Sequence, residues 1–461
     1  MANASRAPAA GDGLPVPRRY WAIAAIVLAI AMSVLDSSIA NVALPTIARE
    51  MRTSAATSIW VVNAYQIAIL VSLLPLAALG EIVGFRRISQ SGLAVFTLAS
   101  LACALAPSMT ALTAARVVQG LGAAGIMSVN AALVRFTYPQ RFLGRAVGIN
   151  AFAVATSAAI GPTVASAVLA VASWRWLFAI NGPVGIVTLL IATFALPVTE
   201  RAARRLSIKG AALHAGAFGL LLSGLQGLAH HAGASLALLQ ITAGCALGVL
   251  LVRHEIARPA PLIPFDLLRI RLFALSIATS VCSFTGQMAA LVALPFEIQR
   301  LGYSAVQTGL LMTPWPVAAA LAAPLAGRLA DRYPAGILCA VGLALLAVGL
   351  LLVGLLPVGA AAPGLIWRMA LCGLGFGFFQ SPNNRTLLLA APRERSGAAG
   401  GMLGTARLLG QTVGAAGVAI LFRVSPGRGA DLALFAAAAV AFLAALVSTS
   451  RRAARPAVAG A

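Results

Sequence analysis

Long apolar runs occupy most of the chain between residues 20 and 449. A helix needs about 20 mostly apolar residues to cross the hydrocarbon core of a bilayer, and such runs recur fourteen times. They lie at 20–44, 58–79, 88–106, 110–134, 144–170, 176–196, 210–229, 234–252, 271–294, 306–328, 335–356, 363–384, 397–421 and 431–449. Only 10% of the residues are charged, against about 25% in soluble proteins. The sequence therefore predicts an all-α integral membrane protein with about fourteen transmembrane helices.

Basic residues are unevenly distributed between the two sides of the membrane. If the amino terminus is cytoplasmic, 24 of the 33 basic residues lie in cytoplasmic segments, six lie outside and three lie within spans. Because basic residues concentrate in cytoplasmic loops, we predict a multi-pass protein of the cell (plasma or inner) membrane with both termini in the cytoplasm. The net charge of +22 then reflects topology, and no nucleic-acid partner is expected.

Several mechanisms lack the residues that they need. The chain has a single lysine, Lys209, outside any GxxxxGK[ST] sequence, which excludes a phosphate-binding loop and ATP as the energy source. The GLGAAG string at 120–125 lies inside an apolar run, where a dinucleotide fingerprint does not function. The five cysteines and four histidines show no metal-ligand spacing. We therefore expect no bound nucleotide, no cofactor and no metal.

Short sequence matches relate the two parts of the chain. VALP at 42–45 recurs at 292–295, Glu81 and Asp331 are also 250 residues apart, and GPTV at 161–164 recurs as GQTV at 410–413. Two six-helix repeats flanking two inserted helices account for this register. The expected divisions are a disordered tail at 1–19, an N-terminal half at 20–196, the inserted helices at 210–252, a C-terminal half at 271–449 and a second tail at 450–461. Paired halves are typical of alternating-access transporters.

Two motifs carry a family resemblance over essentially the whole chain. LDSSIANVALP at 35–45 and LTAARVVQGLGAA at 112–124 resemble the first-helix and fourth-helix signatures of the fourteen-helix drug:proton antiporter family of the major facilitator superfamily. The fifth-helix antiporter motif is met at Gly148, Gly161 and Pro162, with other small residues where the family prefers glycine. Small residues still allow close helix packing. The resemblance implies the major facilitator fold and a monomer.

The resemblance also implies two conformational latch loops. In the first copy, between the second and third spans, the matching residues are Glu81, Gly84, Arg86 and Arg87. The second copy, which follows the tenth span, keeps GRLADR at 327–332, with latch residues Gly327, Asp331 and Arg332. Pro334 stands there where the family has glycine.

Asp36 is the one acidic residue that we place well inside a span. Because a charge at the bilayer centre costs about 2.5–3.5 kcal/mol on insertion scales, an intramembrane carboxylate is a functional candidate. A conformational change that alters its burial or its neighbouring charges can load and release a proton. The alternative is a structural hydrogen bond. Arg116 is the candidate partner, since the rise of 1.5 Å per residue puts both residues at about the same depth; its alternative is to extend to the surface unpaired.

Other polar residues within spans are candidates for a substrate cavity. Arg407 lies near mid-bilayer, where it should face water or a partner. Arg368 lies nearer the membrane surface, which its side chain can reach. Asn41, Gln119 and Gln287 complete the set, and Trp60 and Tyr65 are expected to line the outer cavity. Three intramembrane arginines against one aspartate favour neutral, zwitterionic or monovalent lipophilic substrates over dications.

The leading hypothesis is that a secondary active transporter exports lipophilic small molecules, as in multidrug efflux, in exchange for protons by alternating access. Its partners are then the substrate, protons and the lipid bilayer. A dedicated metabolite exporter of the same fold is the near alternative. A membrane-embedded enzyme would need paired carboxylates, a metal cluster or an activated nucleophile within the spans, so we expect no enzyme. A channel is the other remote alternative.

Overall fold

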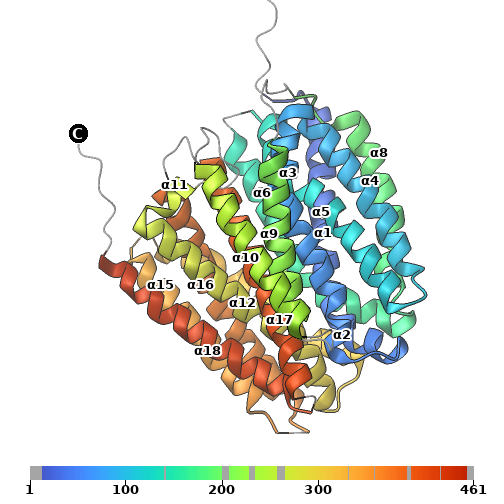
Figure 1. Ribbon diagram of the computed structural model, residues 1–461, viewed down its shortest axis with the longest axis vertical. Coiled ribbons are helices and arrows are strands. Elements are labelled where there is room, and N and C mark those ends of the chain that lie inside the picture. The colour runs from blue at the N-terminus through green and yellow to red at the C-terminus, as the bar shows by residue number, and fades with distance from the viewer. Residues whose placement is uncertain are drawn as a thin grey trace, which may run out of the picture.

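The computed structural model describes residues 13–139, 142–199, 207–227, 234–256, 265–330, 332–357, 359–391, 396–425 and 427–453. Within these ranges the regular structure is helical (Figure 1). The N-terminal half contains α1 (Arg18–Glu50), α2 (Ala55–Ser58), α3 (Trp60–Val83), α4 (Phe85–Ala104), α5 (Met109–Thr137), α6 (Leu143–Val171), α7 (Trp176–Ala179) and α8 (Asn181–Ala195).

The remaining helices follow in three groups. The two inserted helices are α9 (Ile208–Gly227) and α10 (Ala234–Ile256), and α11 (Phe265–Leu268) is a single turn after them. The C-terminal half contains α12 (Arg271–Arg300), α13 (Ala305–Met312), α14 (Pro314–Leu329), α15 (Ala335–Gly354), α16 (Ala362–Ala390), α17 (Ser396–Val424) and α18 (Gly429–Thr449), and η3 (Ser450–Ala453) closes the described chain.

Each of the fourteen predicted spans coincides with helix, and the all-helical membrane fold is confirmed. Thirteen helical segments of the described residues are long and apolar enough to cross a membrane. The segment that falls short is α4, although it is 20 residues long, because Arg86, Arg87 and Gln90 occupy its first two turns. A total of fourteen spans therefore stays a prediction.

The structure departs from the predicted boundaries at several places. α1 begins at Arg18, within the predicted tail, and the backbone N–H of Leu14 donates to the carbonyl of Thr137 at 3.0 Å. η3 extends α18 into the predicted second tail. The spans at 176–196 and 306–328 are each divided in two, before Pro183 and Pro314, which have no N–H to continue a helical ladder. Residues 1–12 and 454–461 lie outside the described chain.

Glycines bring the helices of the N-terminal half close together. Gly122 and Gly125 of α5 lie against Gly92 of α4, where a Cβ at Gly92 would stand 2.8 Å from the Gly122 carbonyl oxygen. On the opposite side of α5, Gly120 lies against the backbone of Tyr65 in α3. The GLGAAG string therefore packs helices together, as small residues do in membranes.

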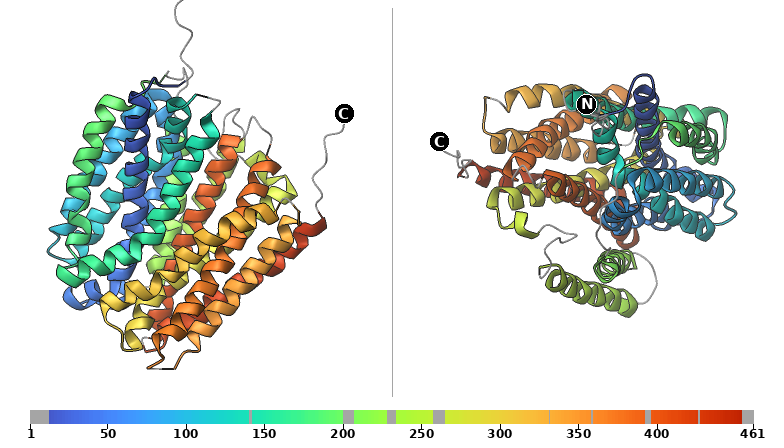
Figure 2. Two further views of the ribbon diagram at one scale, coloured as in Figure 1. Left: turned by 180° about the vertical axis from the view of Figure 1, so that it is seen from behind. Right: turned by 90° about the horizontal axis from the view of Figure 1, so that it is seen from above.

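The two halves repeat the same neighbour relations. In the N-terminal half α1 packs against α5, α6 and α8, while in the C-terminal half α12 packs against α16, α17 and α18. Likewise, α5 packs against α3 and α4, and α16 packs against α14 and α15. Figure 2 shows the two halves side by side, with the inserted helices outside them.

The two halves join at the end of the molecule away from the amino terminus. There one hydrophobic cluster combines 39–47 of α1 with 284–298 of α12 and with Leu311 and Met312 of α13. The Thr163 hydroxyl of α6 hydrogen-bonds the Thr313 hydroxyl at 2.8 Å across this seam. Near the amino terminus, by contrast, the cluster around Ala22, Ile88 and Leu196 contains residues of the N-terminal half alone. We call the end with this shared cluster the closed end; toward the amino terminus the halves meet through Leu74 of α3, which packs against a cluster that contains Ala399 and Met402 of α17.

The inserted helices cover one side of the seam between the halves. α9 packs against α3 of one half and α17 of the other, and α10 packs against α9. His214 of α9 is buried, with its Nε2 3.2 Å from the carbonyl oxygen of Leu70 in α3. A polar contact therefore fixes the inserted pair to the N-terminal half.

Candidate functional site

The side chain of Asp36 lies inside the N-terminal half, where it is 2% exposed. Its Oδ2 forms an ion pair with Nη1 of Arg116, which α5 supplies. Its Oδ1 accepts hydrogen bonds from Nε2 of Gln119 at 2.9 Å and from Nδ2 of Asn181 at 3.0 Å. Three donors thus converge on one carboxylate, which is the arrangement that a buried negative charge requires.

Arg116 is fully buried and is held on several sides. Its Nε donates to the carbonyl of Val61 at 2.7 Å, and its Nη1 donates to Oε1 of Gln119 at 2.6 Å. The guanidinium lies over the ring of Tyr65, 4.2 Å from its centroid, and 5.4 Å from that of Phe178. Its Nη2 has no hydrogen-bond partner among the residues that the structure describes. Arg116 therefore pairs with Asp36 and does not extend to the surface.

The network reaches five of the helices. Gln119 Nε2 also donates to the Ser100 hydroxyl of α4 at 2.8 Å, and the Tyr65 hydroxyl of α3 donates to the carbonyl of Ser33 in α1 at 3.0 Å. Asn181 is the first residue of α8. Because α1, α3, α4, α5 and α8 all contribute, a change at Asp36 acts on the packing of the whole half.

A buried ion pair of this kind is sensitive to protonation. Its desolvation cost is repaid only while both partners are charged and hydrogen-bonded. A proton on Asp36 would leave Arg116 buried without its counter-charge, so the two protonation states favour different packing. The packing of α1 against α5 therefore depends on the charge of Asp36.

Sequence reasoning found part of this network. It selected Asp36, Arg116 and Gln119, but it expected Gln119 among the cavity residues, whereas the structure buries it completely beside Arg116. The reason is the spacing of three residues, which puts both side chains on one face of α5. Tyr65, expected in the outer cavity, is also buried. Asn181 and Ser100 were missed, although each is a polar residue within an apolar run.

The other polar candidates lie apart from this network. Asn41 is buried and donates from Nδ2 to the carbonyl of Ser37 on its own helix at 3.1 Å, while its Oδ1 has no partner. Gln287 of α12 and Arg407 of α17 are half-buried, and neither forms an ion pair or hydrogen bond with a described residue. Arg368 donates to the carbonyl of Gly364 at 2.6 Å. Gln287 and Arg407 are thus the candidates that are free to contact another molecule.

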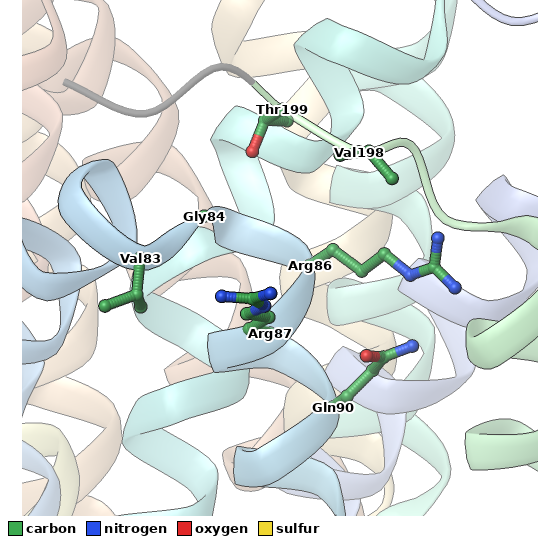
Figure 3. Close-up of a pocket in the computed structure, with 7 residues that line it drawn as sticks. All are labelled: Val83, Gly84, Arg86, Arg87, Gln90, Val198 and Thr199. Carbon is green, nitrogen blue, oxygen red and sulfur yellow. The ribbon is translucent and has the colours of Figure 1, made fainter.

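The first latch loop is built around the turn between α3 and α4 (Figure 3). Gly84 ends α3 with a φ of +102°, a backbone conformation that only glycine adopts readily. Arg86 donates to the carbonyl of Thr193 at the end of α8, and Arg87 is exposed. Glu81 is half-buried near the end of α3 and has an interaction partner. The loop is therefore fastened to α8 of its own half.

The second latch loop is described in part. Gly327 lies in α14, where a Cβ would stand 3.3 Å from the Ser381 hydroxyl of α16. Arg332 is exposed, and Pro334 precedes α15 as its N-cap. Asp331 lies outside the described residues. The latch role of both loops stays a prediction.

The antiporter-motif residues of the fifth span lie in α6. Gly161 lies directly against Ser38 of α1, and the carbonyl of Pro162 lies directly against Gly309 of α13. Gly148 is in the part of α6 nearer the amino terminus. Two of the three residues therefore stand where α6 meets its neighbours at the closed end.

Known sequences show what the chain is similar to. The sequence pattern of the Major Facilitator Superfamily matches residues 26–415. The uncharacterized transporter YebQ of Escherichia coli (strain K12) is 54% identical, over 95% of this chain and 97% of its own. The multidrug resistance protein Stp of Mycobacterium tuberculosis (strain CDC 1551 / Oshkosh) is 33% identical, over 84% of this chain and 73% of Stp. The riboflavin transporter RibZ of Clostridioides difficile (strain 630) is 29% identical, over 87% of this chain and 87% of RibZ.

A solved structure has the same fold. It is a bacterial homologue of the human lysosomal transporter Spinster in an inward-facing and unoccupied conformation, with a TM-score of 0.67 and 17% sequence identity. The match covers 96% of this chain and 100% of that one. At this identity the likeness concerns the arrangement of the helices.

Proposed function

The chain belongs to the major facilitator superfamily, and from that premise we propose that it exports lipophilic small molecules in exchange for protons by alternating access. It is a multi-pass membrane transporter of this superfamily, which is not a family of enzymes. The direction of transport, the proton and the drug-like substrate belong to the proposal.

One observation carries the proton-coupling part of the proposal. The carboxylate of Asp36 is buried, paired with Arg116 and hydrogen-bonded by two amides. A charge in this position is costly to bury, which makes the carboxylate a functional candidate. We propose Asp36 as the proton-binding residue and Arg116 as the counter-charge that responds to it.

The conformation fits one state of the cycle. With the termini in the cytoplasm, as the basic residues favour, the closed end with its shared cluster faces outwards, and the end where the halves meet through Leu74 faces the cytoplasm. Asp36 is then ion-paired in an inward-open state, which corresponds to a carrier that has released its proton and can bind substrate. In the outward-open state a proton would neutralise Asp36 and favour the return of the carrier to the inward-open state.

The energy available from protons suits such an exchange. One pH unit supplies about 1.36 kcal/mol per proton, and 100 mV adds about 2.3 kcal/mol for each net charge moved. Exchange of one proton could therefore sustain about a tenfold substrate gradient from one pH unit alone.

Substrate binding is assigned to the half-buried polar residues. Arg407 and Gln287 stand on α17 and α12 of the C-terminal half without a partner among the described residues. One uncompensated guanidinium favours neutral or anionic lipophilic compounds over cations, because a like charge would be repelled at low dielectric. The multidrug resistance protein among the relatives supports a broad substrate range.

A dedicated metabolite exporter remains the second candidate, and the riboflavin transporter among the relatives favours it. The test is a proteoliposome assay in which a dye reports a preset pH gradient while neutral, anionic and cationic lipophilic compounds are added one at a time. Collapse of the gradient by many unrelated compounds supports multidrug export. Collapse by one narrow chemical class supports the metabolite exporter, and no collapse by any compound contradicts proton exchange.

A further inference from the structure

A basic hollow opens beside the turn between α3 and α4, at the end of the molecule that holds the amino terminus. Its volume is about 310 Å³, and it is lined by Val83, Gly84, Arg86, Arg87, Gln90, Val198 and Thr199. Figure 3 shows Arg86 and Gln90 on the same side of α4, with Val198 and Thr199 above them. The hollow lies in the N-terminal half and shares no residue with the Asp36 network.

The lining carries positive charge that is not balanced. Arg86 and Gln90 donate to the carbonyls of Thr193 and Ala192 at the end of α8, which are neutral acceptors. Arg87 is exposed and has no hydrogen bond to a described residue. No carboxylate is among the residues that line the hollow. Two guanidinium groups therefore face an open space without a counter-ion from its walls.

The polar groups suit a phosphate. Guanidinium groups bind phosphate oxygens with two parallel hydrogen bonds. The Thr199 hydroxyl accepts the backbone N–H of Phe85 at 3.2 Å, so its own proton is free to be donated, and it stands on the same wall as Val198. Hydroxyl and guanidinium donors together form a ready anion-binding site.

The apolar surroundings point to a phosphate that carries acyl chains. Val198, which lines the hollow, is 80% exposed, and the apolar side chains of Phe194 and Leu190 below it are 80% and 55% exposed. Leu190 and Phe194, four residues apart, form an apolar stripe on one face of α8, and Val198 follows after the end of that helix. Tyr20 and Trp21 are also exposed near the start of α1, and such aromatic residues mark the membrane interface.

The C-terminal half lacks the arginine pair at the corresponding positions. At the repeat offset of 250, Arg86 and Arg87 correspond to Gly336 and Ile337. Gly336 instead lies against the backbone of Ser448 and the Cβ of Arg451, where its own Cβ would be 3.0 and 3.3 Å away. The arginine pair is therefore particular to one half and is not required by the repeated fold.

We propose that this hollow binds the headgroup of an anionic phospholipid, with Arg86 and Arg87 on the phosphate and the acyl chains along the stripe of α8. Such a lipid would bridge the α3–α4 turn and the end of α8. Cytoplasmic leaflets are rich in anionic lipid, which fits the predicted orientation of this end.

The test measures lipid binding directly, so it does not depend on transport. Native mass spectrometry of the purified full-length protein with phosphatidylglycerol is compared between wild type, Arg87→Gln and the matched control Lys209→Gln. Arg87 is exposed and forms no hydrogen bond with a described residue, and Lys209 is an exposed cation at the start of α9, outside the hollow. A basic residue near anionic lipid contributes about 1 kcal/mol, so Arg87→Gln should weaken binding about fivefold while the control should not.

Two further arms identify the ligand. Phosphatidylcholine, whose choline cation offsets the charge of its phosphate, should bind more weakly than phosphatidylglycerol. Inorganic phosphate, which lacks acyl chains, should not displace phosphatidylglycerol at equal concentration. Equal phosphatidylglycerol binding by wild type and Arg87→Gln would overturn the site, and displacement by inorganic phosphate would overturn the lipid assignment in favour of a soluble anion.

Discussion

The guanidinium of Arg116 and the carboxylate of Asp36 meet inside the N-terminal half, with side-chain exposures of 0% and 1%. The pair joins α1 to α5, and Gln119 and Asn181 complete the hydrogen bonds of the carboxylate. Because the charges balance each other only while both are present, the pair is a point where stability and protonation are linked.

Removal of Arg116 should destabilise the protein more than removal of the pair. Loss of one partner from a buried ion pair costs about 3–5 kcal/mol, so Arg116→Gln should lower the thermal unfolding midpoint in detergent markedly. The double variant Asp36→Asn with Arg116→Gln should be more stable than Arg116→Gln alone. Strict additivity of the two single effects would show that the residues do not interact.

Asn181 should tune the pH dependence of transport. Its Nδ2 is one of the two amide groups that donate to Oδ1 of Asp36, so its removal leaves the carboxylate with fewer donors. We expect Asn181→Leu to change the pH profile of transport. Thr188→Val is the matched control, because Thr188 lies on the same helix and donates to the Val184 carbonyl of that helix. An unchanged pH profile in Asn181→Leu would remove Asn181 from the coupling network.

A cross-link at the closed end should trap the carrier. Thr163 and Thr313 hydrogen-bond across the seam, so cysteines at both positions can form a disulfide in this conformation. In a background without the five native cysteines, oxidation of the double variant should stop transport and reduction should restore it. The single-cysteine variants serve as controls. Continued transport by the oxidised double variant would mean that the seam does not open during the cycle.

Arg407 should affect substrate choice and not folding. It forms no hydrogen bond with a described residue, so Arg407→Gln should change the thermal unfolding midpoint little, in contrast to Arg116→Gln. Loss of the cation should raise KM for anionic compounds and lower it for cationic ones, with the neutral compounds as internal reference. A uniform fall in kcat for all compounds would instead indicate a structural role.

The sequence predicts helices well here because each span must satisfy its backbone hydrogen bonds within itself, which makes hydropathy a direct signal. The common depth of Asp36 and Arg116 follows from helix rise alone. Partners such as Asn181 and Ser100 depend on how α8 and α4 rotate against their neighbours, and a linear sequence does not contain that rotation. The contacts of Arg86 with α8 and the packing of α9 against α3 also depend on tertiary structure, so the linear sequence does not predict them.

The most direct test of proton coupling through Asp36 compares wild type with Asp36→Asn in proteoliposomes that hold a preset pH gradient. A compound that wild type transports is added while internal pH and compound uptake are both recorded. The account predicts that wild type moves protons as it moves the compound and that Asp36→Asn moves none with it, with both proteins assayed well below the lowered unfolding midpoint expected for Asp36→Asn. Equal proton movement by the two proteins would contradict the account and make Asp36 a structural residue.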